Sequence, residues 1–209
     1  MLPTKKEWMD ALILRHGKER QERFSSATVA VCGLGGLGSN VSIMLARAGV
    51  GKLILVDFDK VDLSNLHRQQ YKPSQIGEYK TDALSVNLKE IAPYIELETH
   101  TLRLNEENTV SILKESDIVC EAFDDPMAKA ELANVVLEFM SDKYLVAASG
   151  MAGIGDANDV VTRKISDKFY LCGDGVSDSK KGLPLFSSRV ALCAAHQAHL
   201  ILRILSGEI

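Results

Sequence analysis

The chain has 209 residues, of which 46% are hydrophobic and 25% charged, and its formal net charge at pH 7 is −4. This length suits one α/β domain with a full core and is short for two, so we expect a single domain over residues 1–209. The negative charge argues against nucleic acid as the main partner, because nucleic acid favours a basic face. The sequence has no run of 18 uncharged apolar residues and no apolar leader, so we expect a cytoplasmic protein without a membrane span.

The N-terminal residues 4–24 are highly charged and predict one amphipathic helix, with Trp8, Leu12 and Ile13 on its apolar side. From residue 28 onward, apolar strand patterns alternate with helical ones. This alternation is typical of a Rossmann-like α/β fold, a doubly wound and mostly parallel sheet with helices on both faces. The predicted strands are 28–32, 52–57, 95–101, 117–121 and 144–148, and the predicted helices are 37–49, 81–91, 105–114 and 126–141.

The pattern changes after residue 150. Residues 159–165 predict a strand that need not be parallel to the others, and residues 169–172 form an aromatic, strand-like run. Residues 173–184 are polar and rich in glycine, which is typical of a surface loop. A last helix is expected at 187–206.

A glycine-rich turn, GLGGLG from Gly33 to Gly38, follows the first predicted strand and begins a helix. In this context the pattern predicts a nucleotide site. Gly33 suits a tight turn, Gly35 and Gly36 let the backbone approach a phosphate, and Gly38 allows close packing of helix on strand. Asp57 ends the second strand about 20 residues later, where this fold places an acid against a ribose hydroxyl.

The segment after the second strand is too long for a simple crossover and combines acids for a ribose, an amide at Asn65 and two cations. The acids are Asp57 and Asp59, and the cations are Arg68 and Lys80. Asp124 follows the fourth strand, at the same edge of the sheet. Arg68 and Lys80 can neutralise charge that grows on phosphate oxygens, and Asp124 can hold Mg²⁺, so the set suits cleavage of a triphosphate. The alternative for Arg68 and Lys80 is a solvated surface charge.

Together these motifs resemble the ThiF/MoeB/HesA adenylyltransferases, relatives of the ubiquitin-activating enzymes, from about residue 15 to residue 206. The matching segments are GLGGLG at 33–38, VDFDKV at 56–61, SNLHRQ at 64–69, GEYK at 77–80, FDD at 123–125 and ASGMAG at 148–153. The resemblance implies an enzyme that uses ATP and Mg²⁺. Its substrate would be the C-terminal glycine carboxylate of a small, ThiS-like sulfur carrier protein that ends in Gly-Gly.

The resemblance also implies residue roles. Asp57 would hold the ribose, Lys80 would contact phosphates, and Asp124 would bind the metal. Asn65, Arg68 and Gln69 would line the ATP site. Family dimers supply an arginine across their interface, so we expect a homodimer; Arg15, Arg20 and Arg23 are the candidates, and their spacing does not choose between them.

The chain departs from many members of that family in lacking the paired CxxC motifs of a zinc site. Its four cysteines are widely spread, so no structural zinc is expected. The chain also ends soon after its last helix. It therefore looks most like the short ThiF-like proteins of thiamine biosynthesis.

Cys172 leaves two interpretations open. It could form a thioester or persulfide with the carrier, or it could be a small buried residue at the end of a strand. Asp174 would raise the pKa of this thiol by charge repulsion, which disfavours a reactive role, whereas Lys180 and Lys181 could compensate. Cys32, Cys120 and Cys193 are interpreted as buried apolar residues.

Other functions of the same fold also stay open. One is an adenylating enzyme with another substrate, such as a modified tRNA base, although the acidic charge counts against it. Another is an NAD-binding Rossmann oxidoreductase or regulator. A third is an interaction module without catalytic activity, which loss of Arg68 or Asp124 would have favoured.

Overall fold

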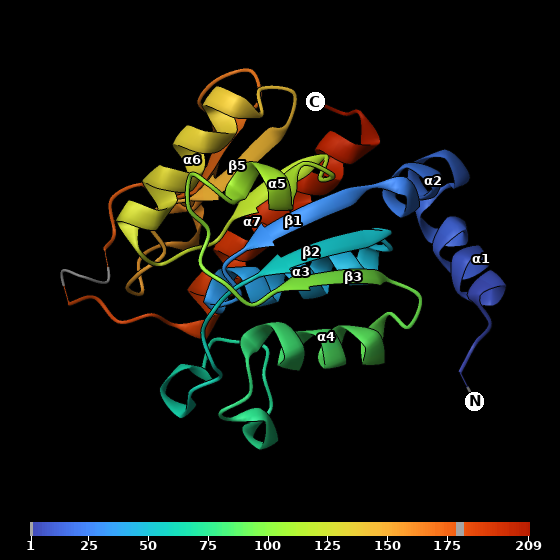
Figure 1. Ribbon diagram of the computed structural model, residues 1–209, viewed down its shortest axis with the longest axis horizontal. Helices are drawn as coiled ribbons and strands as arrows, with labels where there is room; N and C mark the ends of the chain where they lie inside the picture. Colours follow the sequence, from blue (N-terminus) through green and yellow to red (C-terminus); the bar gives the residue numbers. More distant parts are fainter. Residues whose placement is uncertain (1, 179–181) are drawn as a thin grey trace.

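The computed structural model describes residues 2–178 and 182–209 and shows a seven-stranded sheet in the order β3-β2-β1-β4-β5-β7-β6 (Figure 1). Among the strands of the described residues, β6 alone is antiparallel to its neighbour. The strands are β1 Thr28–Cys32, β2 Lys52–Val56, β3 Glu96–His100, β4 Ile118–Glu121, β5 Tyr144–Ala148, β6 Val161–Lys164 and β7 Phe169–Gly173. The predicted Rossmann-like fold class is confirmed.

Helices cover both faces of this sheet, which explains why its central strands are apolar on both sides. One core joins the sheet to α3 (Gly36–Ala48), α4 (Lys80–Ile91) and α7 (Ser187–Ser206). The other core lies under α5 (Thr109–Leu113) and α6 (Pro126–Phe139). Short 3₁₀ turns are found at Leu63–Asn65, Pro73–Gln75 and Ala157–Asp159.

The strand order reverses between β1 and β4, which lie side by side in parallel with Cys32 opposite Glu121. β1 continues to β2 on one side, while β4 continues to β5 on the other. In such a fold, ligands bind in the crevice outside the carboxyl ends of the strands at this switch point. The glycine turn after β1 and the Asp124 turn after β4 both lie there.

The N-terminal prediction was wrong in one respect, because residues 4–24 do not form one helix. Gly17 has φ of +83°, a left-handed conformation that suits glycine, and it separates α1 (Lys5–His16) from α2 (Lys18–Ser26). The apolar side of α1 also has a role within the domain. Trp8 packs partly buried against the larger core, and the Leu12 side chain lies against Gly49.

The remaining helices and strands are of the type that the sequence predicts, but some differ in length. The strand expected at 159–165 is the antiparallel β6, and the aromatic run is β7, parallel to β5. The helix expected at 105–114 shortens to α5 because residues 105–108 form a turn held by the Asn105 and Asn108 side chains. Within the described residues, no helix has both the length and the apolar character to cross a membrane.

Candidate functional site

The glycine turn packs so closely that a Cβ atom on either of two glycines, Gly33 or Gly38, would collide with backbone atoms. A Cβ atom on Gly38 would lie 1.8 Å from the carbonyl oxygen of Gly33. Gly33 itself has φ of +92°, and a Cβ there would lie 2.8 Å from the carbonyl oxygen of Ala122. Gly35 is different, because among the described residues beyond its chain neighbours a Cβ there would meet only Gln69 Nε2, at 3.7 Å. The described residues therefore leave room for a methyl group at Gly35, with Gln69 in ordinary van der Waals contact.

Helix α3 begins at this turn without a capping side chain. The backbone N–H groups of Gly35, Gly36 and Leu37 donate to no acceptor within the described part of the chain. Free N–H groups and the positive end of the helix dipole favour an anion at this position. The turn therefore has both the space and the donors for a phosphate.

Asp57 holds the turn from the end of β2. Its Oδ2 accepts from Leu34 N at 2.6 Å, and its Oδ1 accepts from Asp59 N at 2.8 Å. Burial raises the pKa of Asp57, and the Lys80 ammonium 3.8 Å away opposes that shift together with the two N–H groups. Tyr71 completes the arrangement by donating its hydroxyl to Leu34 O at 2.7 Å.

Lys80 is the first residue of α4, and it is buried in an ion pair with Asp59 at 2.7 Å. Its side chain is 6% exposed, whereas that of Asp59 is 50% exposed. In this state Lys80 reinforces the two carboxylates after β2. Direct contact between Lys80 and phosphates therefore requires a nucleotide to displace Asp59 or to reach Lys80 beside it.

Arg68 and Asp124 come from the segments after β2 and β4 and lie close enough to interact. Partial burial lowers the pKa of the Arg68 guanidinium, and the Asp124 carboxylate opposes this shift. Arg68 also donates to Asn65 Oδ1 at 2.8 Å. Asp124 is exposed, and its carboxylate accepts no hydrogen bond from the described residues.

Gln69 is buried, and its Oε1 has no hydrogen-bond partner among the described residues. Because buried polar groups normally find partners, this amide is available to a bound molecule. The structure thus brings Gln69, Asn65 and Arg68 to the edge of the glycine turn.

The structure favours the structural interpretation of Cys172. The residue is fully buried in β7, and burial raises the pKa of its thiol to about 11, although a contact with Thr162 works in the other direction. Asp174 does not cause the raised pKa of the Cys172 thiol, because the Asp174 carboxylate is paired with Arg189 at 2.8 Å. Lys180 and Lys181 lie outside the described residues.

Sequence reasoning missed two buried ion pairs near the site. Glu121, at the end of β4, is paired with Lys129 of α6. Asp174, just after β7, is paired with Arg189 of α7, whose Nη1 donates to the carbonyl oxygens of Gly155 and Asp156. A charged residue at the end of the apolar run IVCE was the available signal for Glu121.

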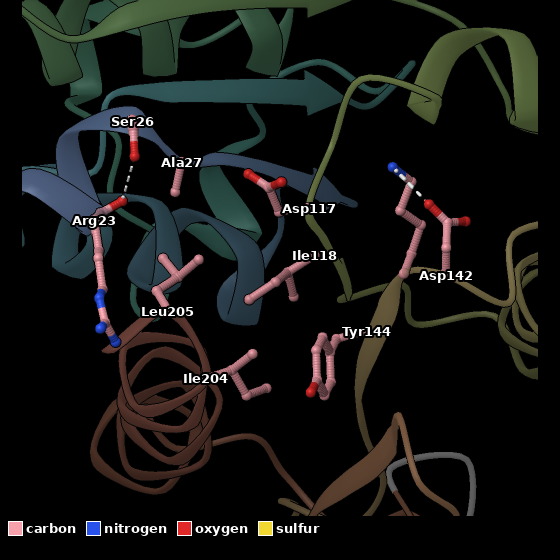
Figure 2. Close-up of a pocket in the computed structure, with 10 residues that line it drawn as sticks. Arg23, Ser26, Ala27, Asp117, Ile118, Asp142, Tyr144, Ile204 and Leu205 are labelled. Carbon is pink, nitrogen blue, oxygen red and sulfur yellow. Dashed lines mark hydrogen bonds and ion pairs between the residues drawn. The ribbon is translucent and has the colours of Figure 1, made fainter. Parts of the chain in front are cut away.

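A pocket of about 460 Å³ lies at the opposite edge of the sheet, beside the first residues of β4 and β5 (Figure 2). Ile118, Tyr144 and Ile204 face it, as Figure 2 shows. The charged groups there already serve the chain, because Asp117 accepts from Thr28 N and Arg23 donates to Ser206 O. This pocket is therefore separate from the site at the glycine turn.

A protein-family model, the ThiF family, matches residues 9–209. The chain belongs to the ThiF family. The chain is 41% identical over 110 residues to the sulfur carrier protein adenylyltransferase of Thermus thermophilus, and 38% identical over 136 residues to the adenylyltransferase and sulfurtransferase UBA4 of Candida glabrata. These alignments cover 52% and 65% of this chain, and 41% and 31% of those relatives. The chain thus spans less than half the length of either curated relative.

Among solved structures, this ThiF-family chain is similar to the E. coli tRNA N6-threonylcarbamoyladenosine dehydratase TcdA in complex with AMP. The TM-score is 0.87 at 18% identity, and the match covers 100% of this chain and 99% of that one. A second match is E. coli MccB, with a TM-score of 0.73 at 20% identity, covering 91% of this chain and 59% of that one. Identities this low support the fold alone.

The two glycines that differ in surroundings give a first prediction. Gly38→Ala should lower the free energy of unfolding by at least about 1–3 kcal/mol, because the new methyl group overlaps the Gly33 carbonyl. Gly35→Ala should change it by less than about 0.5 kcal/mol while weakening ATP binding. Urea denaturation and calorimetric titration with ATP measure the two effects. Equal stability of both variants would contradict this interpretation of the turn.

The Asp174–Arg189 pair gives a prediction on pH. Although burial works against ionisation, hydrogen bonds from Ser177, Val176 and Arg189 hold the pKa of Asp174 well below its usual range. The ionised Asp174 therefore stabilises the fold above the pKa that an aspartate has in the unfolded chain, about 3.9. This stabilisation is lost as the pH falls below that value. Asp174→Asn should cost about 3 kcal/mol at pH 7, and the difference should shrink by pH 3. Urea denaturation at both pH values tests this; a constant difference would disagree.

Proposed function

We propose that this chain is an ATP-dependent adenylyltransferase that activates the C-terminal glycine carboxylate of a small, ubiquitin-like sulfur carrier protein. The observation that carries the proposal is that Arg68, which contacts Gly36 and is close enough to Asp124 to interact with its charge, lies beside the unpartnered N–H groups of the glycine turn. The relative of Thermus thermophilus that is named a sulfur carrier protein adenylyltransferase supports this carrier class. A ThiS-like carrier in the thiamine pathway, and a cytoplasmic location, are the finer parts of the proposal.

The reaction needs positioning and charge stabilisation more than covalent catalysis. A carboxylate is a poor electrophile, and conversion to an acyl-adenylate provides a good leaving group. A carrier carboxylate oxygen bonds to the α-phosphorus, the bond from that phosphorus to the β-bridging oxygen breaks, and pyrophosphate leaves. The N–H groups of Gly35 to Leu37 bind phosphate oxygens, and Arg68 stabilises the charge that grows on them.

The donor set fits a magnesium ion that arrives with the nucleotide. Mg²⁺ in such sites uses one or two carboxylates, with phosphate oxygens and waters as its other ligands. Asp124 offers one exposed carboxylate, and the described residues hold no group of three candidate ligands that could retain a metal alone. Bound there, the ion would neutralise charge on the phosphates. Asp124 would be the protein ligand that holds it.

Asp57 and Asp59 supply the acids for a ribose. The two oxygens of Asp57 are occupied by backbone donors and approached by Lys80, while Asp59 remains half exposed. Asp59 is therefore the more accessible acceptor for a hydroxyl group, with Asp57 holding the loop in place. Asn65 and Gln69 offer amides to the same ligand.

Removal of either central charge tests the proposal. Asp124→Ala and Arg68→Ala should each lower the rate of ATP–pyrophosphate exchange about 10²–10³-fold, because each removes a group that stabilises developing charge. Both side chains lie at the edge of the sheet outside the core, so both variants should fold. Near-normal exchange in either would overturn its role. Exchange that depended on RNA instead of a carrier would favour the tRNA-modifying alternative, and NAD binding without exchange would favour the oxidoreductase.

We also propose a homodimer in which one protomer completes the ATP site of the other. Three arginines near the N-terminus are candidates for this contact. Arg20 already pairs with Glu208, and Arg23 with Glu19 and the Ser206 carbonyl oxygen. Arg15 is exposed and makes no hydrogen bond or ion pair with the described residues. Arg15 is therefore the candidate that is free to reach a partner.

Mixing inactive variants tests the homodimer and the role of Arg15 together. Arg15→Ala and Arg68→Ala should each lose activity alone, because each removes one cation from every site. A mixture that exchanges subunits should recover up to about a quarter of wild-type activity, since half of the protomers pair across variants and each mixed dimer has one intact site. Lys18→Ala removes a nearby exposed cation as the matched control and should stay active. A monomer with full activity in sedimentation would rule the dimer out.

A further inference from the structure

Glu121 is a buried charge beside the site that the proposed chemistry does not use. It is the last residue of β4, and its side chain is 2% exposed. Lys129 of α6 donates to both of its carboxylate oxygens at 2.9 Å. A buried ion pair is seldom more stabilising than apolar residues of the same shape. The presence of a charge at this position therefore needs another reason.

The Glu121 side chain holds the turn that carries Asp124. Its Oε1 accepts a hydrogen bond from the backbone N–H of Phe123 at 2.7 Å. On the other side of the turn, the Phe123 ring packs on Gly33, where an added Cβ would lie 2.9 Å from Phe123 Cδ1. The residue before Asp124 is thus fixed between the carboxylate and the glycine turn.

Elements from both faces of the sheet meet at the same point. Lys129 Nζ also donates to the carbonyl oxygen of Ala148, at the end of β5, at 3.1 Å. From the opposite face, Gln197 of α7 donates its Nε2 to the carbonyl oxygen of Glu121 at 2.9 Å. The end of β4 is therefore tied to β5, α6 and α7 before the chain turns to Asp124.

We propose that Glu121 and Lys129 are positioning residues for Asp124. The inference rests on the proposed nucleotidyl transfer and deepens it. The pair acts through the Phe123 backbone, so that the turn carrying Asp124 is held in one place before a nucleotide arrives. Because preorganised groups need no rearrangement during the reaction, loss of the pair should lower kcat more than ATP affinity.

The test compares Lys129→Met with a matched lysine at the far edge of the sheet. The side chain of Lys129 is 24% exposed, and that of Lys52, which pairs with Glu98, is 22% exposed. Lys129→Met should lower kcat for pyrophosphate exchange with a ThiS-like carrier about 10- to 100-fold, with the KM for ATP changed less than about threefold. Lys52→Met should leave both unchanged, and Lys129→Arg should restore most of the rate.

Hydrogen exchange in the nucleotide-free protein provides a readout that does not depend on activity. The Phe123 N–H is the donor to Glu121, so its exchange should be about tenfold faster when Glu121 and Lys129 are both replaced by Met, which removes the acceptor, while the strand amides of β4 and β5 stay protected. Unchanged exchange of Phe123 would overturn the inference. If the wild type showed no pyrophosphate exchange, the proposed function would fail, and hydrogen exchange would still decide whether the pair holds this turn.

A double variant separates positioning from simple stability. Glu121→Met/Lys129→Met replaces the ion pair with apolar residues of similar size, which avoids an unpaired buried charge. We expect its Tm to recover relative to Lys129→Met while kcat stays low, because no acceptor remains for the Phe123 N–H. Recovery of kcat together with Tm would show that the pair only stabilises the fold.

Discussion

The approach of helix α3 to the end of β1 is the constraint on which the rest of the site depends. Gly38 has no Cβ, and the space that a Cβ would need is occupied by the Gly33 carbonyl. The helix can therefore start directly at the sheet edge. That start points free N–H groups into the crevice where the strand order reverses. Asp57 then closes the turn from the neighbouring strand through Leu34 N. The proposed nucleotide site thus depends first on backbone packing, to which Asp57 adds one side-chain contact.

Charged residues around this turn fall into two groups with different physical roles. Glu121 and Asp174 are buried and fully paired, and their partners tie neighbouring elements together. Arg68 and Asp124 remain accessible and are only partly compensated. Breaking a buried pair is costly even where the pair adds little net stability, so the first group defines one geometry. The second group is left with charge available for a ligand.

Much of this could be predicted from sequence because it depends on local pattern. The strand bounds at Thr28–Cys32 and Tyr144–Ala148 matched, since apolar β-branched runs between turn residues have few alternatives. The break at Gly17 was not predicted, because a charged helical pattern gives no signal of a left-handed residue beyond the glycine itself. Pairings such as Glu121 with Lys129 or Arg189 with Asp174 depend on how distant segments pack. The sequence marks these residues only as charges in unusual places.

Lys80 shows how the buried and the accessible groups are connected. Its ammonium lies between Asp59 at 2.7 Å and Asp57 at 3.8 Å, inside the loop that would hold a ribose. Burial of an ammonium group is costly without anions beside it, and the two carboxylates provide those anions. A nucleotide would bring further negative charge to the same place, so Lys80 can hold the loop in the absence of ligand and share its charge with phosphates when ligand binds. In the proposed mechanism, the same lysine would therefore serve both the empty and the nucleotide-bound site from the start of α4.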